Sequence, residues 1–119
     1  MKSLLFAVCL IAMCGCSAQQ KNLQSSAVPS VLIDVRTPDE RAKFGYINGS
    51  ICIVHTEIGD KISKFVPDRN TAVGVYCRSG RRSAMAAKVL KKRGYTKVTD
   101  YGGFKEAAKK LNLPVVNAK

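Results

Sequence analysis

Residues 71–94 are TAVGVYCRSGRRSAMAAKVLKKRG, which combine a predicted strand, a short basic loop and a predicted helix. The first six residues are mostly β-branched or aromatic, and this composition favours a buried strand. The segment after the loop is rich in alanine, leucine and lysine, which are good helix formers, and Gly94 is a typical helix end. Cys77 therefore lies where a strand ends and a helix is about to begin.

This position predicts a reactive thiol. Backbone N–H groups converge at the start of a helix, and the positive end of the helix dipole points to the same place. Such surroundings bind anions and lower the pKa of a cysteine, which makes its sulfur a nucleophile. A free cysteine is more commonly inert and buried. Here, however, three arginines follow Cys77 within five residues, namely Arg78, Arg81 and Arg82.

Further strands and helices alternate along the chain. Residues 31–35 (VLIDV) are almost continuously apolar, as in a parallel strand covered on both faces. Residues 37–40 (TPDE) form a capping box with proline at the first helical position, and the short helix ends near Gly45. Residues 50–54 predict a second strand. The helix after it is predicted to bury one face, made of Ile58, Ile62, Phe65 and Val66.

The last strand is predicted over residues 98–101. The helix that follows has apolar residues at positions 104, 107, 108 and 111, and Pro114 ends it. Alternating strands and helices predict an α/β domain with a central, mostly parallel sheet and helices on both faces. Ligands of such sheets bind beyond the carboxyl ends of the strands, where Cys77 is expected.

The N-terminus has the features of a secretory signal peptide, because a lysine precedes an apolar run at residues 4–13 that is too short to span a bilayer. Residues 13–17 (MCGCS) resemble a bacterial lipoprotein box, which predicts lipidation of Cys16; ordinary cleavage after Ala18 is the alternative. We therefore expect a signal peptide of lipoprotein type (1–16), a flexible tether (17–30), one domain (31–113) and a C-terminal tail (114–119). The expected location is periplasmic, with a lipid anchor in a membrane.

The formal net charge is +12, which favours anionic partners. Nucleic acid is disfavoured because the chain has few aromatics and no binding motif.

Of the five cysteines only Cys52 and Cys77 lie in the predicted domain, so no disulfide framework is expected. Cys52, within an apolar strand, is predicted to be inert. His55 is the only histidine, and we expect it on the surface or in a loop.

Four segments, in this order, resemble the rhodanese family: VLIDVRTPDE (31–40), GYINGSI (45–51), VYCRSGRRS (75–83) and GYTKVTDYGGF (94–104). The resemblance covers residues 31–113 and is strongest to the small single-domain periplasmic rhodaneses. Two positions depart from it. Tyr46 stands where many members have histidine, and residues 52–54 (CIV) stand where many have Asn-Ile-Pro.

The resemblance implies a three-layer α/β fold and thiosulfate sulfurtransferase chemistry. Cys77 would take the outer sulfur of a small anionic donor such as thiosulfate as a persulfide and pass it to cyanide or a thiol. The substrate-binding residues would be those of the loop and helix start: Arg78, Ser79, Gly80, Arg81, Arg82 and Ser83. Their N–H groups would surround the persulfide, while the arginines would hold the sulfonate. No metal or organic cofactor is implied, and Asp34 and Arg36 are interpreted as structural.

Three alternatives remain open. Some phosphatases and arsenate reductases share this fold, but their loop has arginine at the sixth position after the cysteine, where this chain has Ser83. Other rhodanese domains are non-catalytic binding modules, although these often lack the cysteine. The third alternative is a persulfide carrier that serves a protein partner.

Overall fold

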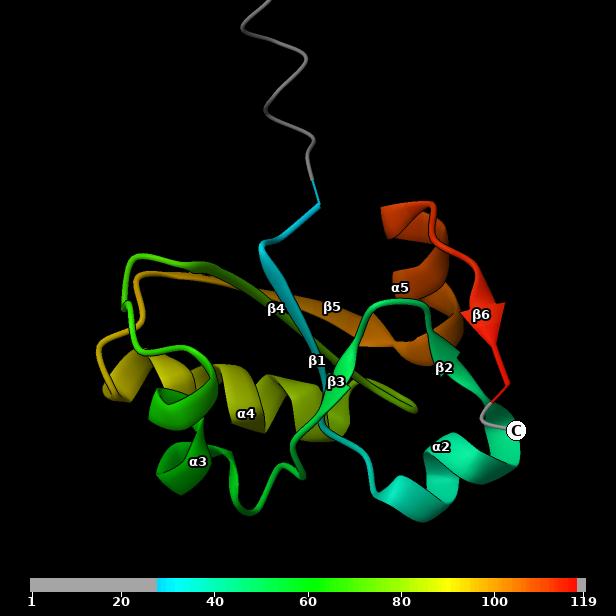
Figure 1. Cartoon of the computed structure of the whole chain (residues 1–119), viewed down its shortest axis with the longest axis horizontal. Coiled ribbons are helices and arrows are strands. Elements are labelled where there is room, and N and C mark those ends of the chain that lie inside the picture. Colours follow the sequence, from blue (N-terminus) through cyan, green and yellow to red (C-terminus); the bar gives the residue numbers. More distant parts are fainter. Residues whose placement is uncertain (1–27, 118–119) are drawn as a thin grey trace, which may run out of the picture.

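The computed structural model describes residues 28–117 (Figure 1). Strands and helices alternate along most of this part of the chain. In order they are β1 (Val31–Asp34), α2 (Pro38–Phe44), β2 (Tyr46–Ile47), β3 (Ile51–Cys52), α3 (Ile58–Phe65), β4 (Ala72–Cys77), α4 (Arg81–Lys92), β5 (Lys97–Gly103), α5 (Phe104–Leu111) and β6 (Val115–Val116).

The main sheet has four parallel strands in the order β3-β1-β4-β5. β1 and β4 are interior strands, which explains why their sequences are almost continuously apolar. The predicted mostly parallel sheet is therefore confirmed. All four strands end at the same edge, and Cys77 is the last residue of β4.

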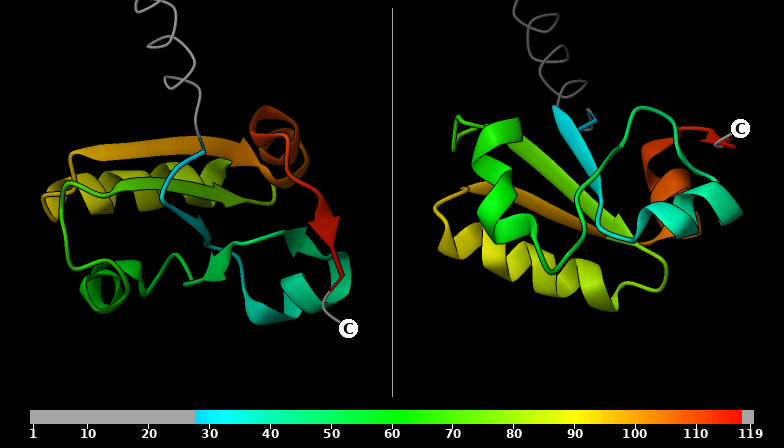
Figure 2. Two further views of the ribbon diagram at one scale, coloured as in Figure 1. Left: turned by 45° about the horizontal axis from the view of Figure 1, so that its top comes forward. Right: turned by 60° about the horizontal axis from the view of Figure 1, so that its bottom comes forward.

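Helices cover both faces of the sheet, as predicted. Alternate residues of each strand point to opposite faces. Ile33, Val75 and Cys77 pack with residues of α3 and α4, whereas Leu32 and Tyr76 pack with residues of α5 and β2. Two views show α3 beside α4 on one side of the sheet, with α5 and β6 on the other (Figure 2).

Several boundaries differ from the sequence prediction. β2 and β6 form an unpredicted antiparallel pair, with Tyr46 opposite Val116, so the fold continues to Val116 within the segment expected to be a tail. Phe65, predicted to face the core, is 53% exposed because it ends α3, while the next residue, Val66, is buried. The helix after Cys77, which the sequence predicts from Ser83 to Arg93, begins at Arg81 and ends at Lys92.

The helices found within residues 28–117 lack the length and the apolar composition that a membrane span requires. The predicted signal peptide and lipidation of Cys16 lie outside the described residues and stay predictions.

Candidate functional site

Cys77 lies at the end of β4, at the bottom of a short loop. The loop leaves the strand at Arg78 and enters α4 after Gly80, whose φ of +101° is a left-handed conformation that favours glycine. Gly103 of β5 pairs with Cys77 and also bridges Ser79. The thiol therefore lies where a strand ends and a helix is about to begin, as the sequence predicted, and the structure adds β5 beside it.

Hydrogen-bond donors surround the sulfur. The Gly80 N–H donates to Cys77 Sγ at 2.9 Å and the Ser83 N–H at 3.3 Å, while the Ser83 hydroxyl oxygen lies 3.6 Å from the sulfur. Burial by itself would raise the pKa of Cys77. The N–H groups of Ser83, Gly80 and Ser79, together with the Ser83 hydroxyl, outweigh that effect and lower the pKa below its ordinary value. The site is therefore built to hold a thiolate.

We expect Cys77 to be alkylated by iodoacetamide at lower pH than Cys52. Only the thiolate reacts, and the pKa of Cys77 is lowered while burial raises that of Cys52. As pH rises from 5 to 9, labelling of Cys77 should therefore reach its plateau first. Peptide mass mapping of short reactions resolves the two cysteines. Labelling of both along the same pH curve would contradict the thiolate site.

The three loop arginines have different surroundings. Arg82 forms a bidentate ion pair with Glu40, with both N–O distances 2.9 Å. The exposed Arg78 places its guanidinium carbon 4.5 Å from the centre of the Phe44 ring. Arg81 is exposed in the first turn of α4 and has no ion pair within the described residues. Arg78 and Arg81 therefore have their charges available to an anion, whereas Arg82 already has a carboxylate partner.

Glu40 connects α2 to the helix that follows Cys77. Its carboxylate accepts from the Thr37 N–H at 3.1 Å, and its own N–H donates to the Thr37 hydroxyl at 3.3 Å, which confirms the predicted capping box. The bonds from Arg82 are the main reason that the pKa of Glu40 is lowered to about 2. The carboxylate is therefore charged at neutral pH and holds Arg82 beside α2.

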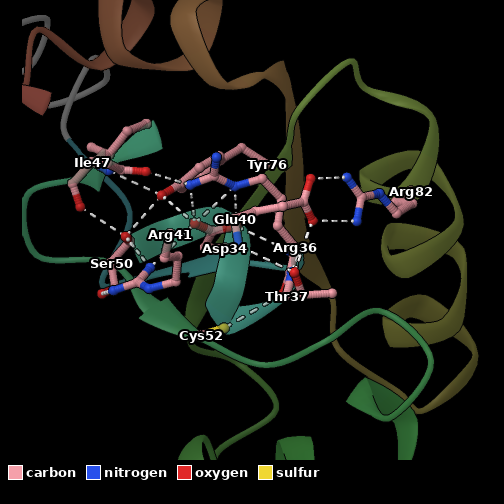
Figure 3. A network of polar contacts seen from close by, with 11 residues as sticks. Asp34, Arg36, Thr37, Glu40, Arg41, Ile47, Ser50, Cys52, Tyr76 and Arg82 are labelled. Carbon is pink, nitrogen blue, oxygen red and sulfur yellow. Dashed lines mark hydrogen bonds and ion pairs between the residues drawn. The ribbon is translucent and has the colours of Figure 1, made fainter. Parts of the chain in front are cut away.

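A buried polar network supports β4 from the other face of the sheet (Figure 3). Arg36 Nε and Nη2 donate to Asp34 at 2.7 to 3.1 Å, and both side chains are fully buried. The Tyr76 hydroxyl donates to Asp34 at 3.0 Å and accepts from the Ile47 N–H. Burial raises the pKa of Tyr76 to about 12, so this hydroxyl stays protonated. These contacts support the structural interpretation of Asp34 and Arg36.

A cavity of about 580 Å³ opens beside the loop. Arg78 and Ser79 line it on the loop side, Phe44 of α2 lies on another side, and the start of α5 completes it. The side chain of Cys77 is fully buried and does not line this cavity. The volume is in the range of small-molecule sites.

The other candidate residues lie outside this arrangement. Cys52 is half-buried, and its thiol donates to the Arg36 carbonyl at 3.5 Å. His55 is also half-buried, and its Nδ1 has no hydrogen-bond partner among the described residues. Within residues 28–117 there is no group of three or more His, Cys, Asp or Glu side chains placed to hold a metal ion.

The chain is similar to known proteins over most of its length. The family model described as a rhodanese-like domain matches residues 17–110. The thiosulfate sulfurtransferase PspE of Escherichia coli strain K12 is 41% identical over 76 residues, which cover 64% of this chain and 72% of that protein. A sulfurtransferase of Allochromatium vinosum is 36% identical over 86 residues, 72% of this chain and 78% of that protein.

A solved structure, described as a rhodanese with anions from E. coli, has a TM-score of 0.66 and 38% identity. It covers 74% of this chain, and the match takes in 98% of that structure.

Proposed function

Because this chain belongs to the rhodanese family of sulfurtransferases, we propose that it transfers sulfane sulfur from thiosulfate or a similar donor to a thiol or cyanide, through a persulfide on Cys77. The observation that carries this proposal is the set of donors around the buried sulfur, in which Gly80 and Ser83 both donate their N–H to Sγ.

The first half-reaction follows from a thiolate at this place. Cys77 Sγ attacks the outer sulfur of thiosulfate and forms a new S–S bond. The S–S bond within thiosulfate breaks, and sulfite leaves with the electron pair. Because the donor and the leaving group are both anions, unpaired positive charge beside the loop favours the reaction. Arg78 and Arg81 supply such charge, whereas Arg82 is paired with Glu40.

We expect Arg81→Ala to lower kcat/KM for thiosulfate more than Lys92→Ala does. A hydrogen bond to a charged group contributes about 1.5 to 3 kcal/mol, so losing it should lower kcat/KM roughly 10- to 150-fold. Lys92 is the matched control, because it is an exposed cation at the far end of the same helix. The contrary result is that both variants lose the same small factor in kcat/KM and that added salt removes their difference from the unchanged protein. Arg81 would then act only through long-range attraction.

Intact mass tests the proposal directly. After incubation with thiosulfate, the protein should gain the mass of one sulfur atom on Cys77, and it should lose that mass when cyanide is added. A gain of sulfur that only a protein acceptor removes would identify a persulfide carrier. If thiosulfate adds no mass to the protein, the proposal is overturned, and a non-catalytic binding module or a phosphatase becomes the remaining interpretation.

A further inference from the structure

The two edges of the main sheet carry different side chains. Its four strands are parallel, so all of them end at the edge that carries Cys77 and begin at the opposite edge. The six residues of β4 separate these edges by about 17 Å, because a parallel strand rises about 3.3 Å per residue. The loop before β4 and the turn between α4 and β5 both lie at the edge where the strands begin, at the left end of the molecule in Figure 1.

This end of the domain is strongly basic. Arg69 joins the loop to the turn, because its Nε donates to the Arg93 carbonyl at 2.7 Å and its own carbonyl accepts from the Thr96 N–H at 3.2 Å. The last turn of α4 and the first residue of β5 add further lysines. We define the basic end as the five exposed cations at this place: Arg69, Lys91, Lys92, Arg93 and Lys97.

Carboxylates beside the basic end offset only part of its charge. Asp60 lies 3.7 Å from Arg93, and the Asp60 side chain is 86% exposed, so solvent weakens this pair. Asp68 accepts from the Asn70 N–H at 2.8 Å. Within the described residues the other four cations of the basic end form no ion pair. Most of this positive charge is therefore available to an outside partner.

The N-terminal part of the chain joins the domain beside the basic end. Val31, the first residue of β1, pairs with Val73 of β4, and Val73 pairs with Val98 of β5. Adjacent strands lie about 4.8 Å apart, so the start of β1 is roughly 10 Å from Lys97, the neighbour of Val98. Residues 1–27 therefore connect to the domain next to the basic end, at the edge opposite to Cys77.

We propose that the basic end is a membrane-contact surface that binds the phosphate groups of anionic lipids. A lysine or arginine near an anionic bilayer strengthens binding about fivefold. The long exposed side chains can reach the headgroups without any rearrangement of the domain. Contact through this end directs the Cys77 loop, and the cavity that Arg78 lines, away from the bilayer. The inference does not depend on the chemistry of Cys77.

A nucleic acid is a poorer fit to the basic end. Single strands are bound by exposed aromatic rings on which the bases stack. The Tyr95 ring, by contrast, is buried, and its centre lies 5.1 Å from the Arg69 guanidinium carbon. An anionic bilayer requires only exposed cations at one end of the domain, which the basic end provides. An acidic protein has similar charge, so the test includes an acidic polypeptide.

Vesicle binding by two charge-matched double variants of the full chain provides the test. Vesicles contain phosphatidylcholine and phosphatidylglycerol in equal parts, or phosphatidylcholine alone. Lys91→Gln with Lys97→Gln should weaken binding to the anionic vesicles about 10-fold or more, as two cations at about fivefold each imply. Lys43→Gln with Lys105→Gln removes the same charge at the end that carries the Cys77 loop and should change binding less than about twofold. Residues 1–27 are the same in every variant, so any binding through them is common to all samples.

Alkylation of Cys77 tests which end of the domain faces the bilayer. Iodoacetamide is uncharged, so the vesicle charge does not repel it. The rate of Cys77 alkylation should be the same, within about twofold, for free protein and for protein bound to anionic vesicles, because the basic end lies about 17 Å from the sulfur along β4. Added salt should release the bound protein.

Four results would overturn the inference. The two double variants could lose the same factor in binding, which would mean that only net charge matters. Both kinds of vesicle could bind the protein equally well. Cys77 could be protected from alkylation on anionic vesicles, which would place the other end of the domain against the bilayer. Finally, poly-glutamate could bind through Lys91 and Lys97 while the vesicles do not, which would assign the basic end to an acidic protein.

Discussion

Cys77→Ser is expected to abolish thiosulfate-dependent sulfur transfer, with a rate loss of about a thousandfold or more, as is typical when a nucleophile is removed. The serine hydroxyl fits the same space, but it stays protonated at neutral pH and cannot form a persulfide. The Gly80 and Ser83 N–H groups would still have an oxygen to donate to, so the variant should fold. Sulfite release from thiosulfate and cyanide measures the activity.

Cys52→Ser is the matched control, and it should keep most of the activity. Cys52 is the other cysteine of the described domain, and it lies at the end of β3, separated from β4 by β1. Among the described residues its thiol makes one hydrogen bond, to the Arg36 carbonyl. Equal losses in the two variants, with both still folded by circular dichroism, would show that the nucleophile is wrongly assigned.

Asp34→Asn is expected to be the most destabilising conservative change in the domain. Asp34 is fully buried and accepts hydrogen bonds from Arg36, Arg41 and Tyr76. Removing one partner of a buried ion pair leaves the other charge uncompensated, which costs about 3 to 5 kcal/mol. A domain of this size has a free energy of unfolding of about 5 to 15 kcal/mol, so the loss is a large fraction of its stability. Urea denaturation measures it.

Asp60→Asn makes the same chemical change at an exposed position. The Asp60 side chain is 86% exposed, and its contact with Arg93 is long, at 3.7 Å. Surface changes of this kind usually alter stability by less than about 0.5 kcal/mol. Equal urea midpoints for Asp34→Asn and Asp60→Asn would mean that the buried network contributes little to stability.

The main sheet could be predicted because its signals are local. The apolar runs at β1 and β4 and the TPDE capping box each lie within a few adjacent residues. β2 and β6 were missed because each has only two residues and lies outside any longer apolar run, and each is paired with a partner that is distant along the chain. The outward position of Phe65 was missed because helical spacing predicts which residues share a face, but it does not predict where the helix ends. Phe65 is the last residue of α3, and the chain leaves the helix at Val66.

The site was predictable where it depends on a single segment. Cys77 and the donors that surround it are adjacent in sequence, so the strand, the glycine turn and the helix start place them together. The pairing of Arg82 with Glu40 was missed because it joins two helices that are distant along the chain. The sequence shows that three arginines follow Cys77, but only the packing of α2 against this region decides which of them is already paired.

The left-handed turn at Gly80 also determines when Cys77 becomes reactive. In an unfolded chain the Gly80 and Ser83 N–H groups are hydrogen-bonded to water, and Cys77 is an ordinary thiol. In the folded chain β4 is paired with β1 and β5, and the start of α4 holds these donors against the sulfur. The lowered pKa of Cys77 is therefore a property of the folded domain, because the N–H groups that lower it are brought to the sulfur only by the fold.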